Sequence, residues 1–93
     1  MKKTIEYILK TEDIKIETIR NILAQFGISC YSEFGVVGCW NGKIEMGLAI
    51  QIIDTGIDKV NPVIIECIAQ EIKDQNHQDC VLVEKRELEY KMV

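Results

Sequence analysis

The sequence predicts a single α+β domain, because strand-like and helix-like segments follow one another in the order strand, helix, strand, strand, helix, strand. Two separate segments repeat apolar residues every three or four positions, as helices with one buried face do. Between them, Asn41-Gly42 joins two alternating segments, and this dipeptide is the strongest short signal for a β-hairpin. The 93 residues suffice for one modest core, so we expect residues 1–93 to form one domain.

The first part of the chain contains an alternating segment and then an amphipathic one. Residues 4–10 alternate apolar and polar side chains, which predicts a strand with one buried face. Residues 11–27 place apolar residues on one helical stripe, which predicts a helix that ends at Gly27. The stripe consists of Ile16, Ile19, Ile22, Leu23 and Phe26.

Residues 29–40 and 43–53 form the predicted hairpin, because both turn positions of Asn41-Gly42 favour a positive φ. A two-residue turn sets Trp40 opposite Lys43 and pairs the two strands outward from there. One face then carries the pairs Gly38 with Glu45, Val36 with Gly47, Phe34 with Ala49, and Ser32 with Gln51. The other face is expected to form the core, and it carries Tyr31, Val37, Cys39, Ile44, Met46, Leu48, Ile50 and Ile52.

The second part of the chain adds a helix and a short last strand. Asn61-Pro62 starts the helix, because asparagine caps a helix N-terminus and proline needs no N–H partner there. Its apolar stripe consists of Ile64, Ile65, Ile68, Ala69 and Ile72. Residues 79–84 predict a short strand that is apolar on both sides, and a charged tail follows. The βαββαβ order predicts a ferredoxin-like sandwich, with two helices on one face of a four-stranded antiparallel sheet.

Charge and composition narrow the classes of partner. The formal net charge of −4 disfavours a nucleic-acid polymer, since affinity for its phosphates depends largely on Lys and Arg. Met1-Lys2-Lys3 has the charge of a signal peptide, but no apolar stretch follows it. No segment reaches the roughly 20 apolar residues of a membrane span. We therefore expect a cytoplasmic protein without a membrane partner.

The four cysteines match neither a metal motif nor a disulfide framework. Cys30, Cys39, Cys67 and Cys80 include no C-x-x-C pair, and each lies in or beside an apolar segment. We expect them to be small reduced residues of the core, since free cysteine is often buried. No metal site and no cofactor are predicted.

The hairpin face away from the helices is the predicted binding surface. It carries Trp40 and Phe34 above a floor of small residues, and an open apolar face of this kind is typical of an interaction site. Either another copy of the chain or a small molecule covers it, and a groove between copies combines the two. For a planar ligand, the rings supply stacking, while Glu45 and Gln51 supply hydrogen bonds at its edge.

A polar run, DQNHQD, lies between the second predicted helix and the last strand. It contains the only histidine, His77, which we interpret as a solvated loop residue because nothing in the sequence pairs it with a nucleophile. Gln78 enters the last strand, where its amide can hydrogen-bond to the backbone or to a ligand.

Three motifs can be compared with known proteins: G-x-W-x-G-x-x-E at residues 38–45, an alternating strand at 50–52, and HQDCVLV at 77–83. They resemble a group of small phage and mobile-element proteins of ferredoxin-like fold, although His77 stands where asparagine is commoner. The resemblance implies a counter-defence factor, such as a sponge for cyclic nucleotide or ADP-ribose-derived immune signals. It also implies that the aromatic residues stack on a base, and that helix N-termini or basic side chains such as Lys43 meet phosphates.

We therefore predict a non-enzymatic, homo-oligomeric binding protein that sequesters a nucleotide-type ligand. The residues expected to bind it are Trp40, Glu45, Gln51, Phe34, Gln78 and Lys43. The alternatives are an inhibitor of a host protein, a dimerisation module and a regulatory domain, all using the same face. An enzyme is the least supported class, since the carboxylates Glu6, Glu33 and Glu45 are scattered and no glycine-rich phosphate loop occurs. An RNA-recognition sheet is excluded because the third strand has no aromatic residue.

Overall fold

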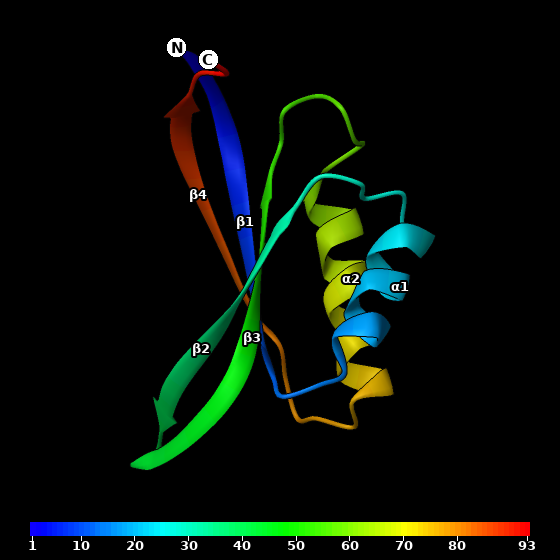
Figure 1. Cartoon of the computed structure of the whole chain (residues 1–93), viewed down its shortest axis with the longest axis vertical. Helices are drawn as coiled ribbons and strands as arrows, with labels where there is room; N and C mark the ends of the chain where they lie inside the picture. The colour runs from blue at the N-terminus through cyan, green and yellow to red at the C-terminus, as the bar shows by residue number, and fades with distance from the viewer.

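The computed structural model describes all 93 residues and contains the six predicted elements in the predicted order (Figure 1). The elements are β1 (Lys2–Glu12), α1 (Ile16–Gln25), β2 (Ser32–Trp40), β3 (Lys43–Ile53), α2 (Pro62–Gln75) and β4 (Leu82–Tyr90). The antiparallel strands form one sheet in the order β2-β3-β1-β4, and both helices cover the same face of it. This is the ferredoxin-like arrangement, so the predicted fold class is confirmed.

The core lies between the helices and the central strands β1 and β3. Leu9, Ile50 and Ile52 face the helices from these strands and are completely buried. The helices close the core with the buried residues Ile19, Ile22, Leu23, Ile65, Ile68, Ala69 and Ile72. Each buried isoleucine or leucine stabilises the fold by about 1.5–3 kcal/mol relative to an exposed one, so this layer contributes most of the stability.

The boundary between β1 and α1 differs from the prediction. Thr11 and Glu12 belong to β1, and α1 begins only at Ile16. The two residues pair with β3, so the sheet retains a segment that helical spacing had assigned to the helix. α2 begins as predicted, since the Asn61 side chain accepts a hydrogen bond from the Ile64 N–H at 3.0 Å. Neither helix combines the length and the apolar character needed to cross a membrane.

The hairpin of β2 and β3 has the predicted register. Asn41 and Gly42 adopt φ angles of 50° and 77°, as a two-residue hairpin turn requires. Trp40 pairs with Lys43, and the pairing continues without a bulge over all nine residues of β2. The two faces of the hairpin are therefore composed as the sequence predicts.

The outer half of this hairpin projects beyond the helices (Figure 1). No helix covers the side that was expected to be core, and Val37, Ile44 and Met46 expose between 69% and 73% of their surface. Cys39 on the same side is also exposed. The prediction of a buried face is therefore wrong for this half of the hairpin. Alternation specifies which side faces the helices, but it does not specify how far the helices reach.

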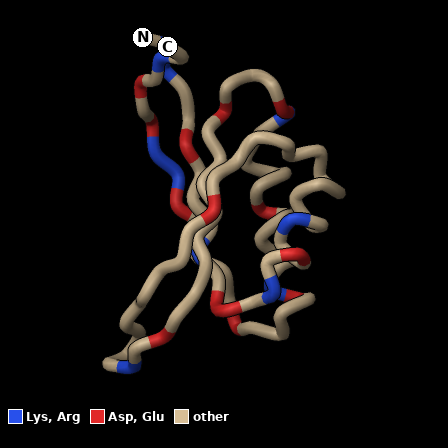
Figure 2. The backbone as a smooth tube through the Cα atoms, viewed as in Figure 1, with Lys and Arg blue, Asp and Glu red and all other residues tan.

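β4 is longer than the predicted strand. Residues 85–90, predicted as a charged tail, continue the strand and pair with residues 2–7 of β1. The paired segment forms an arm at the opposite end of the molecule from the hairpin, and both termini lie at its end (Figure 1). Figure 2 shows charged residues along β4 and few on the hairpin. Charged side chains discourage an exposed edge strand from pairing with other chains.

Two carboxylates fasten neighbouring segments to each other. The Asp58 carboxylate accepts hydrogen bonds from the Ser29 hydroxyl at 2.5 Å and from the N–H groups of Ser29 and Cys30 at 2.8 Å. The hydroxyl bond first, and then the two N–H bonds, lower the pKa of Asp58. Arg20 of α1 likewise donates hydrogen bonds to Glu33 of β2, and these lower the pKa of Glu33. The second contact lies at the root of the hairpin.

Candidate functional site

The sheet face opposite the helices is open, and it carries five of the six residues predicted to bind a ligand. Alternate residues of a strand point to opposite faces, so the register decides which side chains share this one. The residues that share it are Phe34 and Trp40 of β2 with Lys43, Glu45 and Gln51 of β3. Both helices lie on the other side of the sheet (Figure 1).

Trp40 dominates the part of the open face nearest the turn. Its indole lies over Gly38, since a Cβ atom at Gly38 would be 2.8 Å from the indole Nε1. The glycine therefore leaves room for the ring to lie along the strand, and 53% of Trp40 is exposed. Lys43 pairs with Trp40 and Glu45 pairs with Gly38, so one cation and one anion emerge beside the ring. We call Gly38, Trp40, Lys43 and Glu45 the tip group.

Phe34 dominates the part of the open face over the middle of the sheet. It is 44% exposed and pairs with Ala49, which is completely buried. Gln51 pairs with Ser32 and is a diagonal neighbour of Phe34, a spacing of about 7–8 Å between Cα atoms. An aromatic ring with an amide and a hydroxyl beside it can stack on a planar molecule and hydrogen-bond its edge. We call Ser32, Phe34 and Gln51 the central group.

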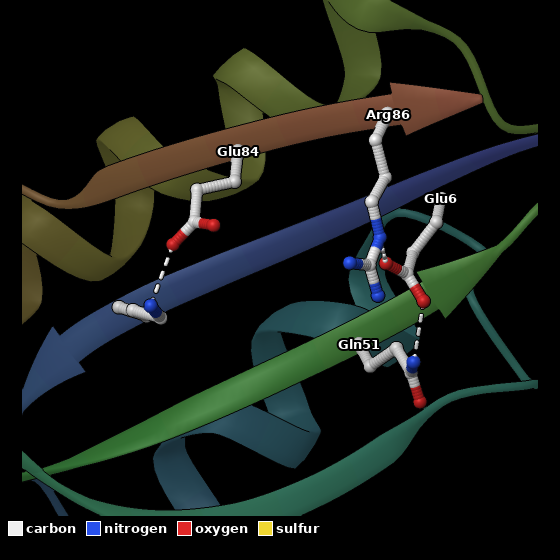
Figure 3. Close-up of polar contacts among 5 residues, drawn as sticks. Glu6, Gln51, Glu84 and Arg86 are labelled. Atoms are coloured by element: carbon white, nitrogen blue, oxygen red, sulfur yellow. Dashed lines mark hydrogen bonds and ion pairs between the residues drawn. The ribbon is translucent and has the colours of Figure 1, made fainter. Parts of the chain in front are cut away.

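The central group adjoins a network of charged side chains over β1 and β4 (Figure 3). Glu6 exposes only 2% of its surface, and its two oxygens accept hydrogen bonds from Arg86 Nε and from Gln51 Nε2, the latter at 2.5 Å. Lys10 and Glu84 form a second ion pair at 2.6 Å. The two terminal nitrogens of Arg86 make no hydrogen bond, so they are free to meet another group.

Glu6 is the residue of this face that the sequence analysis missed, because it was grouped with scattered carboxylates. A signal for it exists in the predicted topology. The ferredoxin-like order makes the first strand a central one, and a carboxylate in the middle of a sheet requires partners because burying a lone charge is costly. Its main partner, Arg86, lies two residues beyond the predicted end of the last strand. The pairing could not be predicted while that strand ended at residue 84.

The tip group and the central group are too far apart for one small ligand to contact both in a single chain. Trp40 and Phe34 are six residues apart on β2, and Glu45 and Gln51 are six residues apart on β3. A strand rises by about 3.3 Å per residue, so each separation is roughly 20 Å. One copy of the chain therefore does not gather all the predicted residues around one ligand.

Gln78 lies away from the open face. It is buried, and its Oε1 accepts hydrogen bonds from Thr11 Oγ1 and Asn76 Nδ2, both at 2.6 Å. Its Nε2 donates to the Cys80 carbonyl oxygen at 2.7 Å. The amide thus ties the end of α2 and the start of the last strand to β1. His77 beside it is exposed, has a φ of 50°, and makes no side-chain hydrogen bond.

The cysteines differ from the prediction that they belong to the core. All four are free, Cys39, Cys67 and Cys80 are exposed, and only Cys30 is partly buried. The prediction is wrong because Cys39 lies beyond the reach of the helices and Cys67 lies outside the buried stripe of α2. No group of three or more His, Cys, Asp or Glu side chains is close enough to hold a metal ion.

Comparison with known proteins places the fold among solved structures of low sequence identity. No family model matches the chain, and no curated protein matches it. GlnK of B. subtilis in complex with ATP superposes with a TM-score of 0.71 at 15% identity, over 92% of this chain and 82% of that chain. A phage SAM lyase in complex with S-methyl-5′-thioadenosine gives 0.70 at 15% identity, over 90% and 81%. CPII, a nitrogen regulatory PII-like protein from Thiomonas intermedia K12 bound to ADP, AMP and bicarbonate, gives 0.66 at 11% identity, over 99% and 97%.

At these identities the likeness shows the shared fold alone. The same sandwich is used by nucleotide-bound regulatory proteins and by a phage enzyme, so the fold does not decide between binding and turnover. The function of this chain therefore depends on its own side chains.

Proposed function

We propose that this protein binds a nucleotide-type small molecule on the open sheet face without transforming it. The observation that carries the proposal is the pair of half-exposed rings, Trp40 and Phe34, each beside small residues and hydrogen-bonding side chains. Such rings bind nucleobases by stacking. The ligands of the three similar structures, ATP, ADP with AMP, and S-methyl-5′-thioadenosine, all contain adenosine, which supports adenine as the base.

Two cations on the open face are suited to the rest of such a ligand. Lys43 emerges beside Trp40, and the free guanidinium nitrogens of Arg86 lie beyond the central group. A guanidinium can hydrogen-bond a phosphate or a carboxylate through two nitrogens. With a net charge of −4, the protein as a whole does not attract polyanions, so the proposed ligand is a small nucleotide rather than a polymer.

The proposed protein is a homo-oligomer, and the ligand site lies in a groove between copies. The hairpin is apolar on both faces, with Val37, Ile44 and Met46 exposed on one and the aromatic rings on the other. Exposed apolar patches of this kind mark interfaces. A second copy packed against the hairpin covers it and brings the tip group of one chain toward the central group of the other. That arrangement accounts for ligand-type residues that are roughly 20 Å apart in one chain.

Binding rather than turnover is supported by how the acidic side chains are used. Glu6 and Glu33 are held in ion pairs by Arg86 and Arg20, and His77 lies in the loop between α2 and β4. A general base needs to be free to accept the proton it removes, and the two ion-paired carboxylates are not free in this way. In a phage or mobile element, retention of a nucleotide-derived immune signal makes such a protein a counter-defence sponge.

The test is a titration that follows Trp40 fluorescence and the thermal midpoint. The panel contains AMP, ATP, S-methyl-5′-thioadenosine, cyclic dinucleotides and cyclic ADP-ribose isomers. A ligand at 100 times its Kd is expected to stabilise the fold by about 2.7 kcal/mol. Phe34→Ala and Trp40→Ala should each weaken binding by about tenfold or more, since base stacking contributes about 1–3 kcal/mol. Val63→Ala, at another exposed apolar residue, is the matched control.

Three outcomes would contradict the proposal. Indifference to the whole panel, together with capture of a defined host protein through the hairpin, would favour the alternative of a protein-binding inhibitor. Conversion of a bound ligand, or of S-adenosylmethionine, into a product separable by chromatography would make the protein an enzyme. Binding that survives both aromatic substitutions would place the site elsewhere on the molecule.

A further inference from the structure

We infer that Glu6 is a positioning residue. It holds the Gln51 amide so that the amide carbonyl oxygen faces β2, the strand that carries the other two members of the central group. The central group thereby selects a ligand edge that carries an N–H donor, such as the 6-amino group of adenine. This inference rests on the proposed function and specifies which base that site accepts.

The position of Glu6 is fixed from two sides. Its carboxylate is almost completely buried on the central strand β1, and Arg86 of β4 donates a hydrogen bond from Nε to one of its oxygens. A carboxylate can only accept hydrogen bonds. The second oxygen is therefore an acceptor aimed across the sheet toward β3.

This acceptor decides how the Gln51 amide is oriented. The amide group carries donors on Nε2 and an acceptor on Oε1, so only Nε2 can face the carboxylate, and it does so at 2.5 Å. The opposite orientation would set two acceptors against each other. Oε1 consequently points away from Glu6 toward β2, as Figure 3 shows, and it makes no hydrogen bond within the protein.

The free Oε1 lies within reach of a ring stacked on Phe34. Gln51 and Phe34 are diagonal neighbours on adjacent strands, and Ser32 lies directly across from Gln51. The 6-amino group of adenine can donate to Oε1, whereas unsubstituted purine has no donor there. A site built to hydrogen-bond a ligand group rejects the analogue that lacks it, because the acceptor is then desolvated without a partner.

The experiment compares AMP with purine riboside 5′-monophosphate, which differs from AMP only by the missing amino group. Calorimetric titration should show that the wild-type protein binds AMP at least about tenfold more tightly. Glu6→Gln replaces the carboxylate with an amide that can donate or accept, so Gln51 is free to turn and the preference should fall below about threefold. Glu84→Gln removes a carboxylate from the neighbouring ion pair with Lys10 and leaves the Glu6 contact to Gln51 in place, so this control should keep the preference.

The outcomes separate this inference from the proposed function. Equal affinity of the wild-type protein for the two nucleotides would overturn the inference and leave nucleotide binding in place, whereas no binding of either would overturn both. A Glu6→Gln variant that keeps the full preference would show that Glu6 does not position Gln51. If that variant does not fold, Gln51→Leu supplies the test, and retention of the preference without the carbonyl oxygen would overturn the inference.

Discussion

The two ends of the sheet form arms of opposite character. At one end β2 and β3 extend past the helices, and at the other β1 and β4 do (Figures 1 and 2). The hairpin arm carries only Lys43 and Glu45 in its outer half and exposes apolar side chains on both faces. Five of the nine residues of β4 are charged: Glu84, Lys85, Arg86, Glu87 and Glu89.

The two arms therefore share a two-stranded geometry but differ in how well they tolerate contact with water. A two-stranded ribbon is only marginally stable by itself in water. The β1/β4 arm is suited to water, because Glu6 and Arg86 form an ion pair across its strands and the charged side chains of β4 protect the edge. The β2/β3 arm buries its apolar side chains only when something covers it, so the proposed interface and ligand groove lie on the hairpin.

The largest effect is expected at Gly47, because the pairing of β3 with β1 ends there and the hairpin extends beyond it. It pairs with Glu12, the last residue of β1, and a Cβ atom on it would lie 2.2 Å from the Thr11 carbonyl oxygen. A clash with backbone cannot be relieved by turning a side chain. We expect Gly47→Ala to destabilise the fold by about 3 kcal/mol, which lowers Tm by roughly 12–24 °C in a thermal unfolding experiment.

Gly35 provides the control, since it lies in the same hairpin and a Cβ atom there meets nothing within 4 Å. Gly35→Ala should change stability by less than about 1 kcal/mol. Equal effects at the two glycines would show that the departure of the hairpin does not depend on the close approach of β1 at Gly47.

The second prediction concerns assembly. In Ile44→Glu/Met46→Glu, two exposed apolar side chains of the hairpin arm become carboxylates. Burial of each apolar side chain contributes about 1.5–3 kcal/mol, so the dissociation constant of the oligomer should rise by at least about 100-fold. Sedimentation velocity at several concentrations measures this change. Both residues are exposed in the single chain, so its Tm measured under dissociating conditions should stay close to that of the wild type.

Charge reversal on the other arm is the matched control for assembly. Glu87→Lys/Glu89→Lys alters two exposed residues of β4 and should leave the dissociation constant unchanged. If the Glu87→Lys/Glu89→Lys variant dissociated while the Ile44→Glu/Met46→Glu variant stayed assembled, the interface would lie on the β1/β4 arm and not on the hairpin.

The contrast between the arms also explains how far the sequence could predict this molecule. Asn41-Gly42 determined the turn, and the turn determined which residues of β2 and β3 share a face. The helix start at Asn61 was predictable because the cap is a local interaction between neighbouring residues. These features depend on contacts close along the chain, where residue type and spacing carry the information.

The missed features depend on contacts between distant segments. The exposure of Val37 and Met46 depends on how far the helices reach along the sheet, which periodicity does not encode. The last strand was predicted too short because edge-strand charges obscure the alternation that marks a strand. The network around Glu6 includes Arg86, which is eighty residues away in the sequence. The orientation of Gln51 could therefore not be predicted from the residues next to Glu6 or from those next to Arg86.

The smallest expected effect concerns Glu33, at the root of the hairpin arm. The hydrogen bond from Arg20 lowers the pKa of Glu33 below its ordinary value of 4.5, so the folded protein releases this proton more readily than the unfolded chain. The stabilisation is therefore fully present above that value, and it is lost as the pH falls through the lower pKa of the folded state. Both side chains are accessible to water, so Glu33→Gln should lower Tm by only a few degrees at pH 7.

Glu45→Gln is the control, because Glu45 lies on the same hairpin and forms no ion pair. Thermal unfolding from pH 7 to pH 3 should show the Glu33→Gln deficit shrinking below about pH 4.5, and Glu45→Gln should leave Tm close to the wild-type value at pH 7. A Glu33→Gln deficit that persists at pH 3 would mean that Glu33 acts through packing and not through its charge. Because the ion pair is weak and Gly47 is a strict steric requirement, the backbone, rather than the charges at its root, determines where the apolar arm projects.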